Sequence, residues 1–286
     1  MTREKLQEIL YEFIDNSPLN FLGAANDVNT PEDNFGELKG MRFFDHPVFS
    51  IGRADDPGFK MIKQPEVAGE YHLLPQDMLP DAKTVISIVL PHTRSTVESN
   101  KKDSTTPSTE WVYTRTDGQQ VLIATGVRVM DALIADGYKA VTPYTDKKYL
   151  VQGGTDIAPG KEHMPPLSSN WSERHVGYVT GAGTFGLSTN FISKVGSAVR
   201  LISVITDWDV EPDACDYDNW LGYCNQCGAC VRKCPAQAHF TDRPGKDKLK
   251  CVAYLREHGR PHPPRLPSCG KCQTGTPCEF KPMNTK

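Results

Sequence analysis

The stretch Cys224-Asn-Gln-Cys227-Gly-Ala-Cys230-Val-Arg-Lys-Cys234-Pro235 determines how the rest of the chain is interpreted. It spaces four cysteines as C-x2-C-x2-C-x3-C and ends in proline. This spacing lets three thiolates and several backbone N–H groups face one [4Fe–4S] cluster, and in two-cluster proteins the fourth cysteine ligates the other cluster. We therefore predict an iron–sulfur site. A zinc site is the alternative, but zinc takes four ligands and would leave other cysteines unused.

The chain of 286 residues has nine cysteines, and all of them follow residue 214. Disulfides are not expected in a reducing compartment, and an odd count does not close a disulfide framework. The crossover of the fourth cysteine leads us to expect two clusters, each with four ligands. Cluster one takes Cys224, Cys227, Cys230 and Cys278; cluster two takes Cys234, Cys251, Cys269 and Cys272. The ninth cysteine, Cys215, is expected to be a non-ligating thiol.

Composition and charge restrict the class of protein. Hydrophobic residues make up 38% and charged residues 23%, which is typical of a globular chain of about two domains. No apolar run approaches the ~20 residues that cross a bilayer, and the first residues show neither a secretory nor a twin-arginine signal, so we expect a cytoplasmic protein. After residue 214, 12 Lys and Arg stand against 6 Asp and Glu. This excess matches the negative charge of thiolate-ligated clusters, and we do not interpret it as an RNA site.

The apolar pattern alternates helices and strands. We expect helices at 3–15 and 118–136, the latter with an apolar stripe of Ile123, Val127, Met130 and Ile134 and with Gly137 at its C-terminal cap. Buried strands are expected at Val85–Leu90 and Val199–Ile205. We expect irregular structure with short strands at 26–80, and loops at 92–110 and 145–172.

The segment 172–186 contains Gly181-Ala-Gly183-Thr-Phe-Gly186, a G-x-G-x-x-G pattern. A dinucleotide-binding fingerprint needs a strand before it and an acidic residue about 20 positions later. The preceding residues have a helical pattern instead, and no Asp or Glu occurs from 182 to 206. The glycines therefore indicate close backbone approach to a bulky ligand or to a packed neighbour.

Several motifs follow one another in a distinctive order. Upstream are Leu79-Pro80 and Asp136-Gly137-Tyr138; then come Ser172-Glu-Arg174, the glycine pattern, Lys194-Val-Gly196-Ser197, a strand ending at Thr206-Asp207 and the cysteines. From about residue 75 to 280 the chain resembles the cobalamin-dependent iron–sulfur reductases, the group of epoxyqueuosine reductase and the reductive dehalogenases.

The resemblance implies an α+β fold in two parts. Residues 1–210 would form a nitroreductase-like α/β sandwich that binds a corrinoid in its base-off form, and residues 211–286 a bacterial-ferredoxin-like domain with two [4Fe–4S] clusters. The residues implied to contact the corrinoid are Arg174, Thr180, Gly181, Ala182, Gly183, Phe185, Gly186 and Leu187.

A proton donor, where one is needed, would come from the pocket, and its candidates are Tyr178, Glu173 and Tyr149, with His175 beside them. Each also has a plain structural interpretation: a core tyrosine, a helix-capping ion pair with Arg174, or a packed histidine.

The chain also departs from the epoxyqueuosine reductase pattern. That enzyme has an aspartate proton donor shortly before its Glu-Arg pair, whereas residues 167–172 contain no carboxylate. No counterpart of its C-terminal tRNA-binding domain follows Cys278, so queuosine-tRNA chemistry is not expected.

The function that results is an oxidoreductase whose clusters deliver electrons to a corrinoid that reduces a small organohalide- or epoxide-like substrate. We expect a low-potential donor of ferredoxin or flavodoxin type as partner, no membrane and no nucleic acid. The alternative is an electron-transfer or corrinoid-reactivating iron–sulfur protein that acts on a protein partner, with or without another cofactor such as flavin.

Overall fold

The two most apolar stretches of the sequence pair at the centre of an antiparallel sheet. A computed structural model describes residues 1–24, 35–259 and 267–285. In it β2 (Thr84–Pro91) runs antiparallel to β8 (Val199–Thr206), with Ile88 opposite Ile202. The outer strands are β1 (Val48–Arg53) beside β2 and β3 (Ala140–Val141) beside β8, so the order is β1-β2-β8-β3. Both predicted strands are confirmed.

Alternate residues of the central strands are buried on opposite faces of the sheet. In β2, Ile86 and Ile88 belong to one hydrophobic cluster and Val85 to another. In β8, Val204 and Ile205 divide in the same way. The sheet is therefore covered on both sides, which explains why these strands read as continuous apolar runs.

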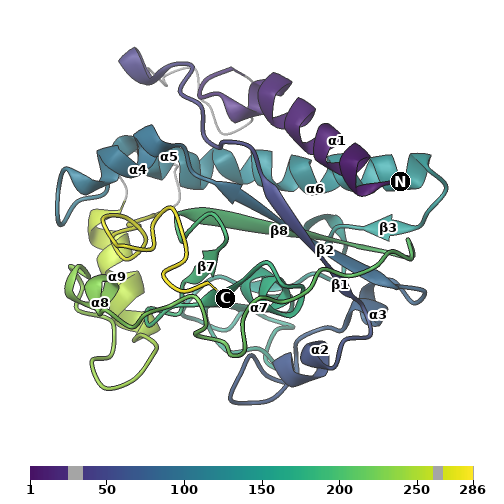
Figure 1. Cartoon of the computed structure of the whole chain (residues 1–286). Helices are drawn as coiled ribbons and strands as arrows, with labels where there is room; N and C mark the ends of the chain where they lie inside the picture. The colour runs from purple at the N-terminus through teal and green to yellow at the C-terminus, as the bar shows by residue number, and fades with distance from the viewer. Residues whose placement is uncertain (25–34, 260–266, 286) are drawn as a thin grey trace.

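Two long helices cover the first face of the sheet, and Figure 1 shows them lying across it. They are α1 (Arg3–Asn16) and α6 (Gly118–Ala135). Leu6 and Leu10 of α1 pack into the same cluster as Leu133 of α6. Both helices are confirmed, and Gly137 follows α6 at φ +90°, as its predicted capping role requires.

The expected stripe of α6 is wrong. The helix buries Val121, Leu122, Val129 and Leu133, whereas Ile134 is 50% exposed. The buried stripe is offset because α6 meets both the sheet and α1, and these contacts select a different side of a helix that is apolar over much of its surface.

Short helices and Trp171 cover the second face. The helices are α2 (Pro57–Ile62), α3 (Pro75–Met78) and α7 (Glu173–Val179). Phe59, Met78 and Val176 pack with Trp171, whose indole N–H donates to Ser203 Oγ at 2.9 Å. This packing fixes the start of α7, which carries Glu173 and Arg174.

The loop expected at 92–110 is wrong, because most of it is helical. Helix α4 spans Arg94–Lys101, and α5 spans Thr109–Thr116. The Thr93 hydroxyl caps α4 by accepting from the N–H of Thr96, and Ser108 caps α5 in the same way. The buried side of α4 includes Thr96, Ser99 and Asn100. Because these buried residues are polar, the hydrophobic pattern of the sequence did not indicate a helix.

The remaining elements are short. The region 26–80 contains β1, α2, α3 and the 3-10 turn Gly36–Leu38, and its residues 26–34 lie outside the described part. The predicted loop 145–172 is confirmed apart from a two-residue ladder of β4 (Val151–Gln152) and β5 (Ser168–Ser169). Two further 3-10 turns span Pro18–Asn20 and Pro143–Thr145. The glycine pattern forms a hairpin of β6 (Gly183–Phe185) and β7 (Phe191–Ser193).

The cysteine-rich segment contains α8 (Ala229–Arg232) and α9 (Lys248–His258), which lie at one end of the sheet in Figure 1. Backbone hydrogen bonds join it to the rest of the chain, as from the N–H of Ser197 to the carbonyl of Cys278 at 2.8 Å. The indole N–H of Trp111 donates to Ser268 at 2.9 Å. These contacts join the cysteine-rich segment to the rest of the chain. The predicted domain boundary at residue 210 stays a prediction.

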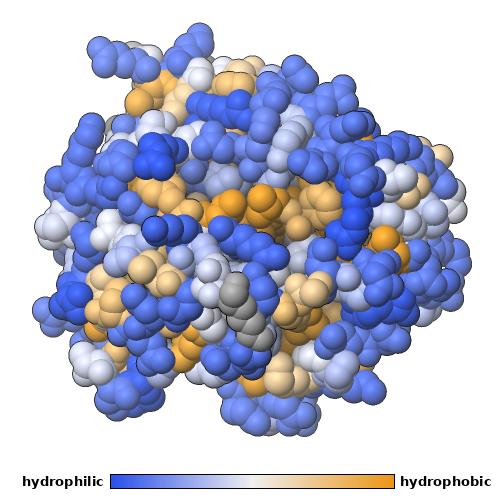
Figure 2. Space-filling model, in the orientation of Figure 1, coloured by the Kyte–Doolittle hydropathy of each residue, from blue (hydrophilic) through white to orange (hydrophobic). Residues whose placement is uncertain are grey.

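Hydrophilic residues predominate on the face that Figure 2 shows, and hydrophobic residues gather in groups between them. Within residues 1–24, 35–259 and 267–285, no helix is long and apolar enough to cross a membrane.

Candidate metal centres and the adjoining cavity

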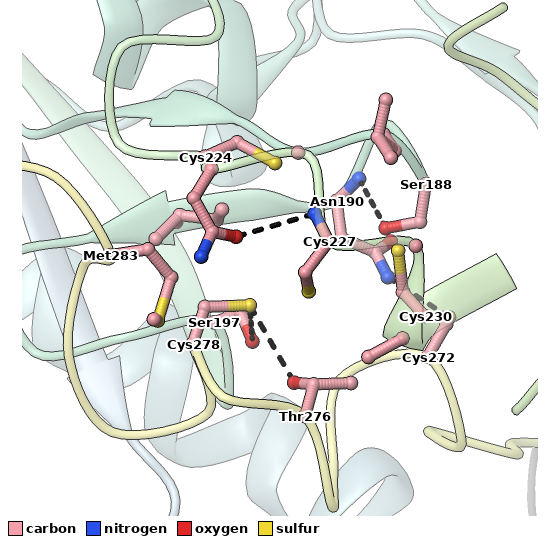
Figure 3. Close-up of a pocket in the computed structure, with 16 residues that line it drawn as sticks. Ser188, Asn190, Ser197, Cys224, Cys227, Cys230, Cys272, Thr276, Cys278 and Met283 are labelled. Atoms are coloured by element: carbon pink, nitrogen blue, oxygen red, sulfur yellow. Dashed lines mark hydrogen bonds between the residues drawn. The ribbon is translucent and has the colours of Figure 1, made fainter. Parts of the chain in front are cut away.

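Cysteines from two distant segments surround one small cavity, which Figure 3 shows with their side chains directed around a common space. Three come from the tight motif before and within α8, and two from the C-terminal segment. They are Cys224, Cys227, Cys230, Cys272 and Cys278. The predicted ligands of cluster one are thus brought together.

The backbone of the motif curls through two left-handed residues. Gln226 has φ +56° and Gly228 has φ +72°. The N–H of Gln226 donates to Cys224 Sγ at 3.3 Å, and Gly228 is the N-cap of α8, which carries Cys230. A non-glycine residue in this conformation costs about 1 kcal/mol or more. The strain is consistent with a loop shaped to direct thiols and N–H groups inward.

The four predicted ligands of cluster two line a second, larger cavity of about 620 Å³. Cys234 follows α8, Cys251 lies on α9, and Cys269 and Cys272 lie in the C-terminal segment. Cys272 lines both cavities, so the two sets of thiols are adjacent.

Thiols that line two cavities are the kind of donor that iron–sulfur clusters take. In the part of the chain that the structure describes, no three Cys, His, Asp or Glu side chains converge as ligands of one metal ion. Each cysteine of a [4Fe–4S] cluster ligates a different iron, so its thiolates lie farther apart than the ligands of one ion. Eight cysteines line the two cavities, which is the number that two such clusters take, and both the number of clusters and the assignment of each ligand stay predictions.

Hydrogen-bond donors surround the sulfurs. The amide of Asn190 donates to Cys272 Sγ at 2.9 Å, and the N–H of Ala238 donates to Cys234 Sγ at 3.4 Å. Burial raises the pKa of Cys269 to about 12. A bare thiol there stays protonated at neutral pH, so iron must displace the proton when it binds.

The larger cavity extends from the cluster-two thiols to the central sheet. Its far wall comes from β8, from the start of α7 and from α5, and Tyr144 adds to it. The side chains there that can carry charge are Arg115, Glu173 and Arg200, whereas Arg174 lies near Cys272 at the cluster-two end. The cavity therefore joins a candidate redox centre to a polar wall.

Glu173 is the unusual group of this wall. Both of its carboxylate oxygens are buried, and within the described residues neither accepts a well-formed hydrogen bond, although Ser203 lies close enough to oppose part of the rise in its pKa. Its position in the first turn of α7 favours a negative charge, but burial opposes it and raises the pKa to about 8. Glu173 is therefore a neutral acid at pH 7.

The other predicted proton donors lie elsewhere. Tyr149 packs on Tyr144 with ring centroids 4.7 Å apart but does not line the cavity.

The ring of Tyr178 stacks on that of Tyr217, with centroids 5.3 Å apart, on the side of the glycine hairpin. His175 shares a hydrogen bond with Ser172 at 2.7 Å, and burial lowers its pKa to about 3. Of Glu173, Tyr149 and Tyr178, only Glu173 lines the larger cavity, as proton transfer into it requires.

The residues predicted to contact a corrinoid divide into three groups. Arg174 lines the larger cavity, and Gly186 and Leu187 line the smaller one. Five residues line neither of these cavities: Thr180, Gly181, Ala182, Gly183 and Phe185.

Packing explains the two glycines of this last group. A Cβ at Gly183 would collide with the carbonyl oxygen of Ile192, and one at Gly181 would lie 3.2 Å from Ser50 Oγ. Of the two meanings that the pattern left open, the packed neighbour accounts for these positions.

Sequence reasoning missed Arg115, Tyr144 and Arg200. The first two come from segments more than 50 residues from Arg200 and carry no motif. Arg200 could have been identified from the sequence, because it interrupts the apolar strand Val-Arg-Leu-Ile-Ser-Val-Ile at 199–205. A charged residue within a buried strand is unfavourable unless it has a partner or a role.

No protein-family model and no curated protein matches the sequence. Solved structures do match. The epoxyqueuosine reductase from Streptococcus thermophilus superposes with a TM-score of 0.51 at 17% identity, over 84% of this chain and 65% of that one. The enzyme from Bacillus subtilis gives 0.50 at 18% identity, over 85% and 66%. The chain has the epoxyqueuosine reductase fold.

The same fold extends to the reductive dehalogenases. The catabolic reductive dehalogenase NpRdhA matches with a TM-score of 0.50 at 14% identity, over 82% of this chain and 30% of that one. The chain spans less than two thirds of the length of each of these structures. The resemblance inferred from the motifs is confirmed at the level of the mixed α/β fold, and the two-cluster ferredoxin-like domain remains a prediction.

Proposed function

We propose that the protein is a cobalamin-dependent iron–sulfur reductase. Two [4Fe–4S] clusters deliver electrons to a base-off corrinoid, which reduces a small organic substrate of organohalide or epoxide type. The observation that carries the proposal is the cavity of about 620 Å³ that cluster-two thiols and Glu173 line together.

The residues of the cavity suit a bound cofactor. Its volume lies within the range of small-molecule and cofactor pockets. Arg174 and Lys248 offer positive charge near the cluster-two end, where a corrinoid's phosphate could pair with them. A bound corrinoid supplies a low-potential, nucleophilic cobalt, and the protein supplies orientation, electrons and protons.

The order of electron transfer follows from exposure. Cys227 of cluster one is exposed, whereas the cluster-two thiols face the larger cavity. Cys272 lies between the two sets. Electrons would therefore enter at cluster one from a ferredoxin- or flavodoxin-type donor and reach the cavity through cluster two.

In this proposal Glu173 is the general acid, the group that donates a proton to the substrate. A neutral carboxyl at the cavity wall can donate its proton at Oε to a substrate anion as the reduction proceeds. Tyr144 lies beside it and lines the same cavity. Tyr149 supports Tyr144 by ring packing, and Tyr178 is assigned to the hairpin core.

The substrate is proposed from the neighbouring families alone. One solved epoxyqueuosine reductase is described with a tRNA-Tyr stem loop, so the expectation that nucleic acid is no partner has no support from these structures. An electron carrier or corrinoid-reactivating protein would keep both clusters and act on a protein partner instead.

Anaerobic reconstitution with iron, sulfide and cobalamin tests the proposal. After removal of free cofactor by gel filtration, we expect about eight irons and one corrinoid per chain. The variant Cys251→Ser should keep cluster one and lose cluster two. Protein that holds both clusters but no corrinoid would instead favour the electron carrier.

A further inference from the structure

Two arginines at the sheet end of the larger cavity share one neutral side-chain acceptor, and the second of them also donates to a backbone carbonyl. Arg115 lies on α5 and Arg200 on β8, and both side chains line the cavity. Oε1 of Gln119 accepts from Arg115 Nη1 at 3.3 Å and from Arg200 Nη2 at 2.6 Å. Within the described residues, neither guanidinium forms an ion pair with a carboxylate. Two positive charges therefore meet with one neutral amide oxygen between them.

This arrangement is unfavourable in the protein alone. Burial and the charge of Arg115 lower the pKa of Arg200 to about 9, far below the ordinary value for a guanidinium. Partly buried like charges repel each other through a weakly screening medium. An anion placed between them would remove the repulsion and fill their unused donors.

Of the other four Lys and Arg side chains that line this cavity, three lie near cysteine thiols, and Lys248 is the exception, because its charged neighbours are Arg174 and Lys246. Arg174 is attracted by the thiolate form of Cys272, and Lys271 by that of Cys269. Within the described residues no cysteine acts on Arg115 or Arg200, and the phenol of Tyr144 is their shared neighbour. Negative charge on the cluster-two thiolates would oppose three of these cations, whereas no thiol stands against Arg115 and Arg200 at the sheet end.

Glu173 gives an independent indication at the same wall. Within the described residues its buried carboxyl accepts no well-formed hydrogen bond, and burial raises its pKa to about 8, so that at neutral pH the carboxyl does not compete with an anionic ligand. The phenol of Tyr144 and the protonated carboxyl of Glu173 add hydrogen-bond donors at this end of the cavity. Guanidinium forks match the two oxygens of a carboxylate.

We propose that Arg115 and Arg200 bind a carboxylate of the organic substrate. The cluster-two end of the cavity is then the cofactor side, and the sheet end is the substrate side. The proposal rests on the proposed function in that the ligand is taken to be the substrate. A phosphate of the cofactor has similar chemistry, and the experiment separates the two sources.

Calorimetric titration of cluster-loaded protein, with and without cobalamin, provides the test. Benzoate is the probe, and neutral benzamide is its isosteric control. We expect benzoate to bind at least about tenfold more tightly than benzamide, since charge-assisted hydrogen bonds are lost in the amide. Equal binding of the two probes would overturn the proposal.

Variants locate the site. Arg115→Gln and Arg200→Gln should each weaken the affinity for benzoate at least about tenfold. The affinity of Arg200→Lys should lie between those of wild type and Arg200→Gln, because lysine keeps the positive charge but not the two-pronged guanidinium geometry. Arg128→Gln, at an exposed position of α6, is the control. Iron content and circular dichroism establish that each variant is folded. Unchanged benzoate affinity in folded Arg115→Gln and Arg200→Gln would refute the assignment.

Cobalamin and cobinamide, which lacks the nucleotide phosphate, distinguish the two sources. We expect both arginine variants to bind cobalamin as the wild type does. Loss of cobalamin but not cobinamide binding in these variants would assign the arginines to the cofactor instead. A wild-type protein that binds benzoate through the arginines but no cobalamin would contradict the proposed function and leave the anion site intact.

Discussion

The side-chain amide of Asn190 donates a hydrogen bond to the thiol of Cys272, with Nδ2 and Sγ 2.9 Å apart. Asn190 lies in the turn of the glycine hairpin, and Cys272 lies in the C-terminal segment that lines both cavities. The turn of the hairpin therefore supplies a hydrogen-bond donor to a predicted cluster ligand.

Removal of this donor should change the potential of cluster two. Hydrogen bonds to the sulfurs stabilise the reduced, more negative cluster. Asn190→Ala should therefore shift the cluster-two potential to a more negative value and leave cluster one unchanged, as followed by EPR redox titration. The matched variant is Thr276→Val, because the Thr276 hydroxyl lies 3.5 Å from Cys278 Sγ. Thr276→Val should change the reduction potential of cluster one alone. A change in the potentials of both clusters in either variant would contradict the assignment of the cysteines to two sets.

Serine substitutions test the ligand sets directly. Cys278→Ser should lower the iron content to about half and remove the EPR signal of cluster one, because the cluster loses one of its four thiolates. Cys215→Ser should retain about eight irons, since Cys215 lines neither cavity. Loss of a cluster in Cys215→Ser would show that the partition is wrong.

Glu173 should make stability depend on pH. Its folded pKa of about 8 lies above the ordinary value of 4.5, so the folded protein holds the proton more tightly than the unfolded chain. This stabilisation is complete below pH ~4.5 and is lost as the pH rises through 8. The free energy of unfolding then falls by at most about 1.4 kcal/mol per pH unit.

Thermal melts between pH 6 and 9 measure this effect. Wild type should lose stability with rising pH relative to Glu173→Gln, which keeps the shape of the side chain without its charge. The control is Glu257→Gln, whose side chain is 77% exposed. Parallel melting curves for wild type and Glu173→Gln would show that the carboxyl is solvated. In a corrinoid-loaded enzyme, Glu173→Gln should also lower the rate of substrate reduction by about 10²–10⁴-fold.

Gly183 offers a test of the glycine pattern. Gly183→Ala places a methyl group against the carbonyl oxygen of Ile192 and should cost about 1–3 kcal/mol of stability or more, as measured by urea unfolding. At Gly186 the nearest atom to an added Cβ is the terminal Cδ1 of Ile192 at 3.2 Å, so Gly186→Ala should be milder. A stable Gly183→Ala variant with weakened cobalamin binding would restore the ligand-contact interpretation.

Local pattern was sufficient to predict the central strands, α1 and α6. Periodicity works there because each element buries apolar residues against a close neighbour, as Leu6 of α1 does against α6. It failed at α4, whose inward face is polar. Asn100 is buried because its amide donates to the carbonyl of Cys269, 169 positions away, and no local pattern records such a partner.

The candidate site divides in the same way. Tight cysteine spacing encodes the motif at 224–235, because neighbouring ligands must reach one cluster. The polar wall is assembled from α5, Tyr144, α7 and β8, so its composition depends on the fold. Glu173 was among the sequence candidates, whereas Arg115 lies 85 positions from Arg200 and could be placed beside it only by the structure.

EPR of reconstituted protein with cob(II)alamin tests the central claim most directly. The account predicts about eight irons per chain and a bound cobalt signal of the base-off form, distinct from that of free cobalamin. A protein with both clusters whose cobalt spectrum matches free cobalamin would contradict it.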